Sequence, residues 1–116
     1  MNFTHTSSED IVFIRFSGDL LGDTSGIKVA DVANDYINDN KLYCAVDISA
    51  VKFMNSAGLG VLIMLLTKFR NKNGELILIN PSEHIKKLLI ITKLHSIFTI
   101  VGSDEEAKEY FKNIPK

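Results

Sequence analysis

The segment from Asp47 to Ile63 constrains the fold most strongly, because it joins the most strand-like part of the chain to the most apolar helix-like part. Residues 42–48 are apolar on both alternations until Asp47, which is typical of a strand covered on both faces. Residues 57–66 form an uncharged block that is too long for a typical strand. The pattern predicts a central strand that turns directly into a helix, which should end near Asn73.

The rest of the chain alternates strand and helix patterns after an initial hairpin. Two short strand patterns flank the polar turn at residues 7–10. Asn80, Pro81 and Glu83 predict a helix start, with an N-cap, a proline at the first helical position and an acid at the third. Ser103 begins a capping box before the last helix. The expected strands are 3–6, 11–17, 42–48, 76–79 and 97–101, and the expected helices are about 25–40, 57–73, 81–92 and 104–114.

These elements predict a single α/β domain over residues 1–116. Its central sheet should be mixed and mostly parallel, with four or five strands that begin with the hairpin, and about four α-helices should cover it. Right-handed crossovers would join the parallel neighbours. A chain of 116 residues buries roughly two-thirds of its unfolded surface, so it can form an independent core without a disulfide.

The start of the central helix has two polar side chains that could cap the helix or form a functional site. Either Asn55 or Ser56 falls at its N-cap, where a side-chain oxygen can accept a hydrogen bond from an otherwise unpaired backbone N–H group. The same N–H groups and the helix dipole favour a phosphate there by roughly 0.3 to 2 kcal/mol. On residue type alone, a structural cap is the commoner role for such a serine.

Four short motifs together resemble those of one protein family. The longest is Phe53-Met-Asn-Ser-Ala-Gly-Leu-Gly-Val-Leu62, and the others are Gly18-Asp-Leu20, Asn80-Pro-Ser82 and Ile91-Thr-Lys-Leu94. They resemble the segments F-M-D-S-[ST]-G-L-G-V-L, G-E-L, N-P-S and I-T-G-L of the STAS domain, and in particular of the bacterial anti-sigma factor antagonists. The resemblance covers nearly the whole chain. It implies a STAS-like fold and identifies Ser56 as the residue that a partner kinase phosphorylates.

The resemblance also implies a function and its partners. The unphosphorylated protein would bind an anti-sigma factor that is an ATP-dependent serine kinase, and a sigma factor would thereby be freed. Phosphorylation of Ser56 would end the binding, and a serine phosphatase would restore it. ATP would belong to the partner, so this chain would need no cofactor of its own.

The docking surface is expected where loops meet beyond the carboxyl ends of parallel strands. It would combine the loop before the first helix, the strand–helix joint and the start of the helix after residue 80. Its predicted residues are Leu21, Asp23, Thr24, Met54, Asn55, Ala57, Gly58, Leu59, Asn80 and Ser82. For Met54 and Leu59, a place in the core is an equally good interpretation. Ile90, where family members often have an acid, could be an exposed contact or additional core.

Four positions depart from the family pattern. Asn55 stands where an aspartate is usual, and Leu21 stands where many members have a second acid. Ala57 replaces a serine or threonine, and Lys93 replaces the glycine of the turn. Asn55 can still cap the helix, so we expect the fold to be retained. Without the two carboxylates, the site would repel a phosphate less strongly. It would also lack groups that a kinase could use to orient the serine.

Other function classes find little support in the composition. The net charge is −1 and the lysines are scattered, which argues against direct nucleic-acid binding. Cys44 lies in an apolar strand and is expected to be a buried core residue. His5, His84 and His95 have no metal-ligand spacing. Neither phosphate-binding glycine motif is present, and no serine lies in a hydrolase context. We therefore expect no metal, no catalytic residue and no enzymatic activity.

The N-terminal sequence has no signal pattern, and no uncharged run approaches the ~20 residues that span a bilayer. A cytoplasmic protein without membrane insertion is therefore expected. The alternative function is a constitutive STAS interaction subunit with Ser56 unmodified, for instance in a lipid-transport ABC system or in a larger signalling assembly.

Overall fold

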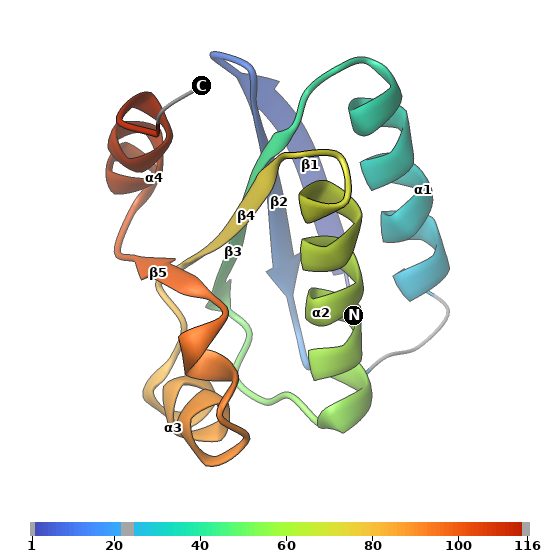
Figure 1. The fold of residues 1–116 in the computed structure, drawn as a ribbon. Coiled ribbons are helices and arrows are strands. Elements are labelled where there is room, and N and C mark those ends of the chain that lie inside the picture. The colour runs from blue at the N-terminus through green and yellow to red at the C-terminus, as the bar shows by residue number, and fades with distance from the viewer. Residues whose placement is uncertain (1, 22–24, 115–116) are drawn as a thin grey trace.

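The computed structural model describes residues 2–21 and 25–114 and has a five-stranded mixed sheet in the order β1-β2-β3-β4-β5 (Figure 1). The first two strands are antiparallel and all later neighbours are parallel, as the sequence predicts. The strands are β1 (Asn2–Ser8), β2 (Ile11–Ser17), β3 (Tyr43–Ala50), β4 (Glu75–Ile79) and β5 (Thr99–Val101). The helices are α1 (Ser25–Asn38), α2 (Ser56–Arg70), α3 (Glu83–Ile91), the 3₁₀ helix η1 (Leu94–Ser96) and α4 (Asp104–Lys112).

The helices divide between the two faces of the sheet. Figure 1 shows α1 and α2 on one face and α4 on the other, while α3 lies beyond the carboxyl ends of β3 and β4. The central strand β3 alternates Cys44 and Val46 toward the first face with Ala45 toward the second, so it is buried on both sides. This arrangement explains why residues 42–48 lack the polar alternation of a half-exposed strand.

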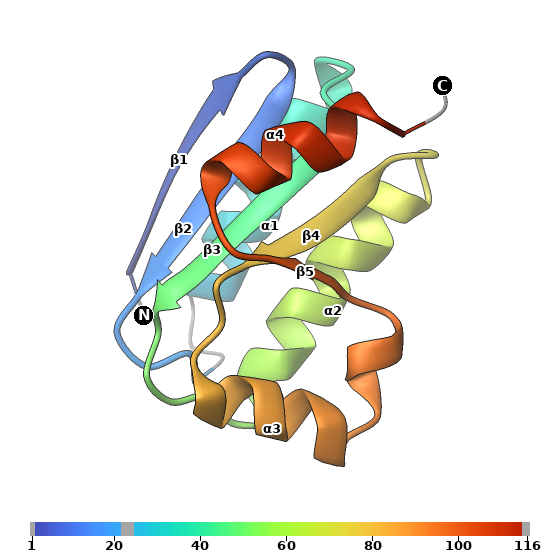
Figure 2. The same ribbon diagram turned by 90° about the vertical axis from the view of Figure 1, so that its left-hand side faces the viewer.

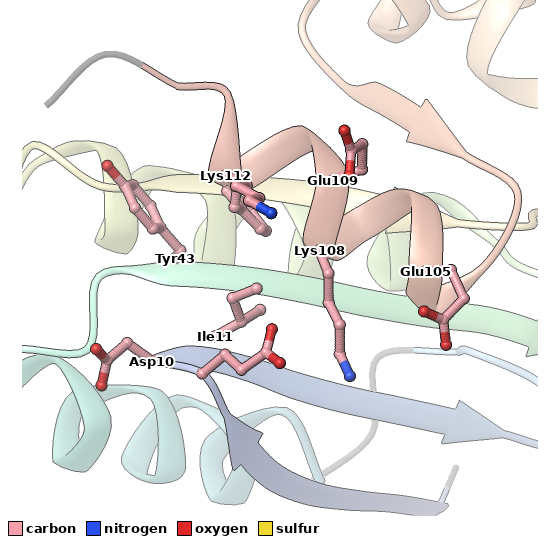
Figure 3. Close-up of a pocket in the computed structure, with 9 residues that line it drawn as sticks. Asp10, Ile11, Tyr43, Glu105, Lys108, Glu109 and Lys112 are labelled. Carbon is pink, nitrogen blue, oxygen red and sulfur yellow. The ribbon is translucent and has the colours of Figure 1, made fainter.

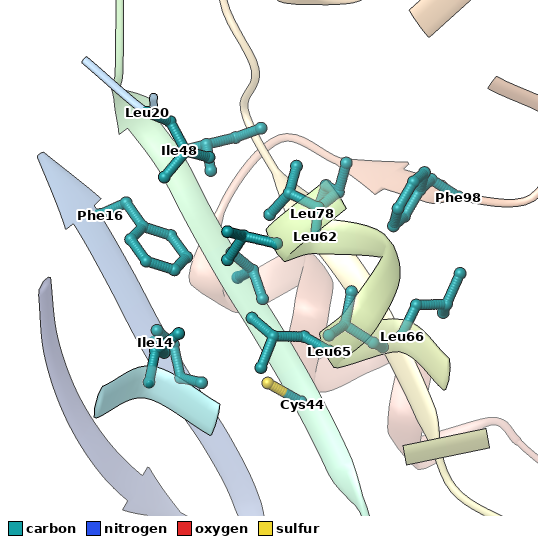
Figure 4. Close-up of a cluster of buried hydrophobic side chains, with 14 of the residues drawn as sticks. Ile14, Phe16, Leu20, Cys44, Ile48, Leu62, Leu65, Leu66, Leu78 and Phe98 are labelled. Atoms are coloured by element: carbon teal, nitrogen blue, oxygen red, sulfur yellow. The ribbon is translucent and has the colours of Figure 1, made fainter. Parts of the chain in front are cut away.

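The larger core lies between the sheet and the helices α1 and α2 (Figure 4). Phe16 and Ile14 of β2 pack there with Leu62 and Leu65 of α2, and all four are almost fully buried. Cys44 is buried in the same core, and burial raises the pKa of its thiol above the ordinary value. Cys44 is thus the buried core residue that the sequence predicts.

The helix α4 closes the opposite face through a smaller apolar cluster and an ionic contact. Phe111 packs there against Tyr43, with stacked rings whose centroids lie 4.9 Å apart. The Arg15 guanidinium on β2 donates to Asp47 Oδ2 at 2.8 Å and to Asp104 Oδ2 at 2.7 Å. The hydrogen bond from Arg15 is the main reason that the pKa of Asp104 lies below its ordinary value. The first turn of α4 is therefore tied to two strands of the sheet.

Two details of the expected elements are wrong. Ser82, and not Asn80, caps α3, because the Ile85 N–H group donates to Ser82 Oγ at 3.3 Å. Asn80 has a left-handed backbone with φ 49°, which asparagine tolerates better than most residues, and its N–H group donates to Val101 O. The last strand is also shorter than residues 97–101, because residues 94–96 form η1 first.

A groove of about 670 Å³ lies between α4 and the turn of the first hairpin (Figure 3). Its walls carry both signs of charge, from Asp10, Glu105, Glu109, Lys108 and Lys112. It lies on the α4 side of the sheet, away from the strand–helix joint that the sequence singles out.

We predict that Asp104→Asn lowers the unfolding free energy at pH 7, because it removes the charge that pairs with Arg15. The loss should be only about 0.5 to 1 kcal/mol, because both side chains of the pair are more than a third exposed. The pKa of Asp104 is lowered in the folded state, so its contribution is complete above the unfolded value of about 3.9 and is lost as the pH falls through the folded value. Urea denaturation of both proteins between pH 2 and pH 7 measures the difference.

Glu105→Gln is the matched control, since Glu105 shares the first turn of α4 but has no ion pair within residues 2–21 and 25–114. An equal loss of stability in the two variants would mean that the helix dipole accounts for the effect and the Arg15 contact does not.

Candidate functional site

The strand–helix joint places Ser56 at the first position of α2 and leaves the capping to Asn55. Asn55 Oδ1 accepts a hydrogen bond from the Gly58 N–H group at 2.8 Å, and Asn55 O accepts from Leu59 N–H at 3.0 Å. The Ser56 side chain is exposed and makes no hydrogen bond within the part of the chain that the structure describes. The hydroxyl is therefore not used by a hydrogen bond within residues 2–21 and 25–114, and it is exposed at the positive end of a helix dipole.

The loop after β2 fixes the position of this joint. Leu20 forms an isolated parallel bridge with Met54, in which Leu20 N–H donates to Phe53 O at 2.9 Å and Asn55 N–H donates to Leu20 O at 3.3 Å. Gly58 allows this approach, because a Cβ atom added there would lie only 2.0 Å from Leu20 O. The glycine of the joint thus serves an internal contact between two loops.

The beginning of α3 completes the surface around the joint. The Phe53 ring stacks on the His84 imidazole with centroids 5.5 Å apart and an interplanar angle of 24°. Figure 2 shows α3 along the lower edge of the molecule, beyond the carboxyl ends of the parallel strands. The joint, the loop after β2 and α3 are therefore neighbours, as expected from the topology.

The predicted docking residues fall into three groups. Exposed or half-buried positions, which can form a surface, are Leu21, Asn55, Ala57, Asn80 and Ser82. Buried positions are Met54, Gly58 and Leu59. Asp23 and Thr24 lie outside the described residues. The core interpretation therefore holds for Met54 and Leu59, which offer little area to a partner, while Gly58 is buried by its close contact with the Leu20 backbone.

Several exposed apolar side chains near the joint were not among the predicted docking residues. Phe53 is 46% exposed although it stacks on His84, and Ile27 on α1 is 69% exposed. Ile90 and Ile91 at the end of α3 are 58% and 77% exposed, so Ile90 is an exposed position and not additional core. The sequence signal for Phe53 was weak, because one aromatic residue in a short connection is usually buried.

Within residues 2–21 and 25–114, no group of three or more His, Cys, Asp or Glu side chains could hold a metal ion. No helix in the described part of the chain is long and apolar enough to cross a membrane.

Comparison with known proteins connects this geometry to one family. The profile of the STAS domain matches residues 2–107. An anti-sigma-B factor antagonist of Listeria monocytogenes is 29% identical over 79 residues, which are 68% of this chain and 69% of that protein. A relative from Bordetella bronchiseptica is 31% identical over 67 residues, and this match spans only 58% of each chain.

Solved structures share the whole fold. A Thermotoga maritima protein superposes with a TM-score of 0.86 at 22% identity, over 96% of this chain and 95% of that one. The anti-sigma factor antagonist SpoIIAA in its unphosphorylated form has a TM-score of 0.76 at 20% identity, over 97% and 100% of the two chains. SpoIIAA from Bacillus in its phosphorylated form gives 0.74 at 20% identity, over 95% and 99%. At these identities the similarity establishes the fold alone.

We predict opposite effects for alanine at the two glycines of the first turns of α2. Gly58→Ala should destabilise the protein by about 1 to 3 kcal/mol, because its Cβ must displace the backbone of Leu20. Gly60→Ala should stabilise it by about 0.5 to 1 kcal/mol, because nothing lies within 4 Å of the added Cβ and alanine favours a helix interior. Urea denaturation provides both values, and similar values for the two variants would contradict the close approach of the Leu20 loop.

Proposed function

The chain belongs to the STAS domain family, and from this premise we propose that it is an anti-sigma factor antagonist controlled by phosphorylation of Ser56. The unphosphorylated form binds an anti-sigma factor that is a serine kinase, and a sigma factor is thereby freed. Phosphorylation by that kinase ends the binding, and a serine phosphatase restores it. ATP is bound by the partner, and this chain contributes a surface and no catalytic group.

The main support for the proposal is that Asn55 caps α2 while the adjacent Ser56 is exposed. Asn55 supplies the cap, so modification of Ser56 removes no hydrogen bond that the described residues make. A phosphate on Ser56 would lie at the N-terminus of α2, where the dipole stabilises an anion by roughly 0.3 to 1 kcal/mol. Modification should therefore leave the folded state intact and act on association.

The surroundings of Ser56 explain why a phosphate would end the binding. Exposed Leu21 and Phe53 and the methyl group of Ala57 place apolar area around Ser56, with the exposed Asp19 and Lys52 in the same segments. A phosphoserine adds about −1.5 to −2 charges at pH 7. An unpaired charge buried in an interface costs several kcal/mol, and each 1.4 kcal/mol weakens binding tenfold. One phosphate is enough to reduce a micromolar affinity to a negligible one.

Similar proteins with known roles support the proposed role as an anti-sigma factor antagonist. The relative from Listeria monocytogenes is an anti-sigma-B factor antagonist, and SpoIIAA has been solved both without and with its phosphate. This chain has the same fold, and it has an exposed serine at its own strand–helix joint.

A second candidate function is a constitutive STAS interaction subunit, for instance in a lipid-transport ABC system. Asn55 and Leu21, in place of the usual acids, favour it, because they remove carboxylates that a kinase could use to orient Ser56. Stable co-purification with a permease ATPase, together with an unmodified Ser56, would distinguish this function from the first.

We predict that the cognate anti-sigma factor kinase and ATP add one phosphate to this protein and none to Ser56→Ala. Ser17→Ala, which removes another exposed serine, should be phosphorylated like the wild type. Intact-protein mass spectrometry measures the transfer. A phosphate that remains in Ser56→Ala would place the acceptor elsewhere, and no transfer by any cognate kinase would favour the constitutive subunit.

A further inference from the structure

The region from α3 to β5 combines positive charge with exposed apolar side chains. The chain has 14 aspartates and glutamates, yet none lies between His84 and Ser103. The same region has three lysines, Lys86, Lys87 and Lys93, together with two histidines. Glu83, just before it, pairs with Lys86 at 3.4 Å. The net charge of this surface is therefore positive in a chain whose overall charge is −1.

The packing of α3 turns the charged and apolar side chains to the same side. Ile85 and Leu89 are fully buried against the core, which leaves Lys87 and Ile91 on the outer face. His84, Lys87 and Ile91 follow one another at helical spacing on that face. Because His84 stacks on exposed Phe53 of the joint, a continuous strip connects the neighbourhood of Ser56 with the end of α3. We call Phe53, His84, Lys87, Ile90, Ile91 and Lys93 the α3 stripe.

Lys93 provides an independent observation, because its backbone is unfavourable for lysine. It follows the last turn of α3 with φ 62°, the left-handed conformation that favours glycine at this position. Its N–H group donates to Ile90 O at 3.0 Å, a bond that glycine would make equally well. The Lys93 ammonium has no ion pair in the described part of the chain. No ion pair within residues 2–21 and 25–114 therefore accounts for a lysine at this position, and its exposed ammonium is available to a partner.

We propose that the α3 stripe is a second part of the partner-binding surface and accommodates a partner segment in which apolar side chains alternate with carboxylates. Ile90 and Ile91 supply apolar area, and Lys87 and Lys93 pair with the carboxylates. The identity of the partner, an anti-sigma factor kinase, rests on the proposed function, but the chemistry of the segment rests on the stripe alone. The aromatic residue Phe53 at the joint favours a protein over a lipid surface, because aromatic side chains are enriched at the centres of protein interfaces.

The test measures binding of the nucleotide-bound kinase to wild-type protein and to four variants by biolayer interferometry at low and high salt. The Lys87→Glu/Lys93→Glu variant should bind at least about tenfold more weakly, and the difference should shrink as salt rises. Ile91→Ser should weaken binding about tenfold through faster dissociation. Lys72→Glu, at an exposed lysine beyond the end of α2, is the control and should bind like the wild type.

Lys93→Gly separates a binding role from a structural one. It should raise Tm by about 4 °C, because it removes the unfavourable backbone of Lys93, and it should slow association with the kinase about threefold. A variant that is more stable and yet binds more slowly cannot owe its defect to unfolding. Equal binding of Lys93→Gly, the double charge reversal and the wild type would overturn the proposal.

Two further arms separate this proposal from its alternatives. If Ser56→Asp abolishes binding while the charge reversal leaves it unchanged, the stripe proposal fails and the phosphorylation switch stands. If the charge reversal weakens binding while Ser56→Asp does not, the stripe proposal stands and the switch fails. Vesicles of phosphatidylglycerol test the lipid alternative: sedimentation of the wild type but not of the charge reversal, with unchanged kinase binding, would overturn the protein partner.

Discussion

The hydrogen bond from the Gly58 N–H group to Asn55 Oδ1 is the contact on which the functional surface depends. It begins α2 at Ser56 and makes Asn55, not the serine, the capping side chain. The same turn needs a glycine at position 58, because Leu20 O occupies the space of a Cβ atom. Capping and close approach together hold the joint in one geometry, so a modification of Ser56 changes the charge of a surface that is already formed.

The contacts that stabilise the fold and the exposed residues proposed to bind a partner lie in different parts of the molecule. The two apolar clusters and the Arg15 contact with Asp47 and Asp104 lie within the sheet and between the sheet and its helices. The exposed apolar side chains Ile90 and Ile91 belong to α3, which lies beyond the carboxyl ends of the strands (Figure 2), and exposed Phe53 follows the carboxyl end of β3 in the chain. A charge introduced at this edge therefore has little access to the core, and changes in the core have little direct effect on a partner.

Much of the fold could be predicted from sequence, because strand order and strand direction follow from local patterns that agree with one another. The doubly buried strand β3 had no polar alternation, and the long apolar block after it could only be helical. The points that the sequence missed or left open have different causes. Asn80 had the residue type of a cap but adopts a left-handed turn, so Ser82 caps α3 instead. Met54 belongs to the core because of its bridge to Leu20, a contact between distant segments that no sequence pattern reveals.

The most direct test of the central claim compares one protein before and after phosphorylation at Ser56. Isothermal titration calorimetry with the partner kinase, and urea denaturation of both forms, measure association and stability separately. The account predicts that the phosphate weakens binding by at least about a hundredfold and changes the unfolding free energy by less than about 0.5 kcal/mol. Equal affinities, or a loss of binding that merely accompanies unfolding, would contradict it.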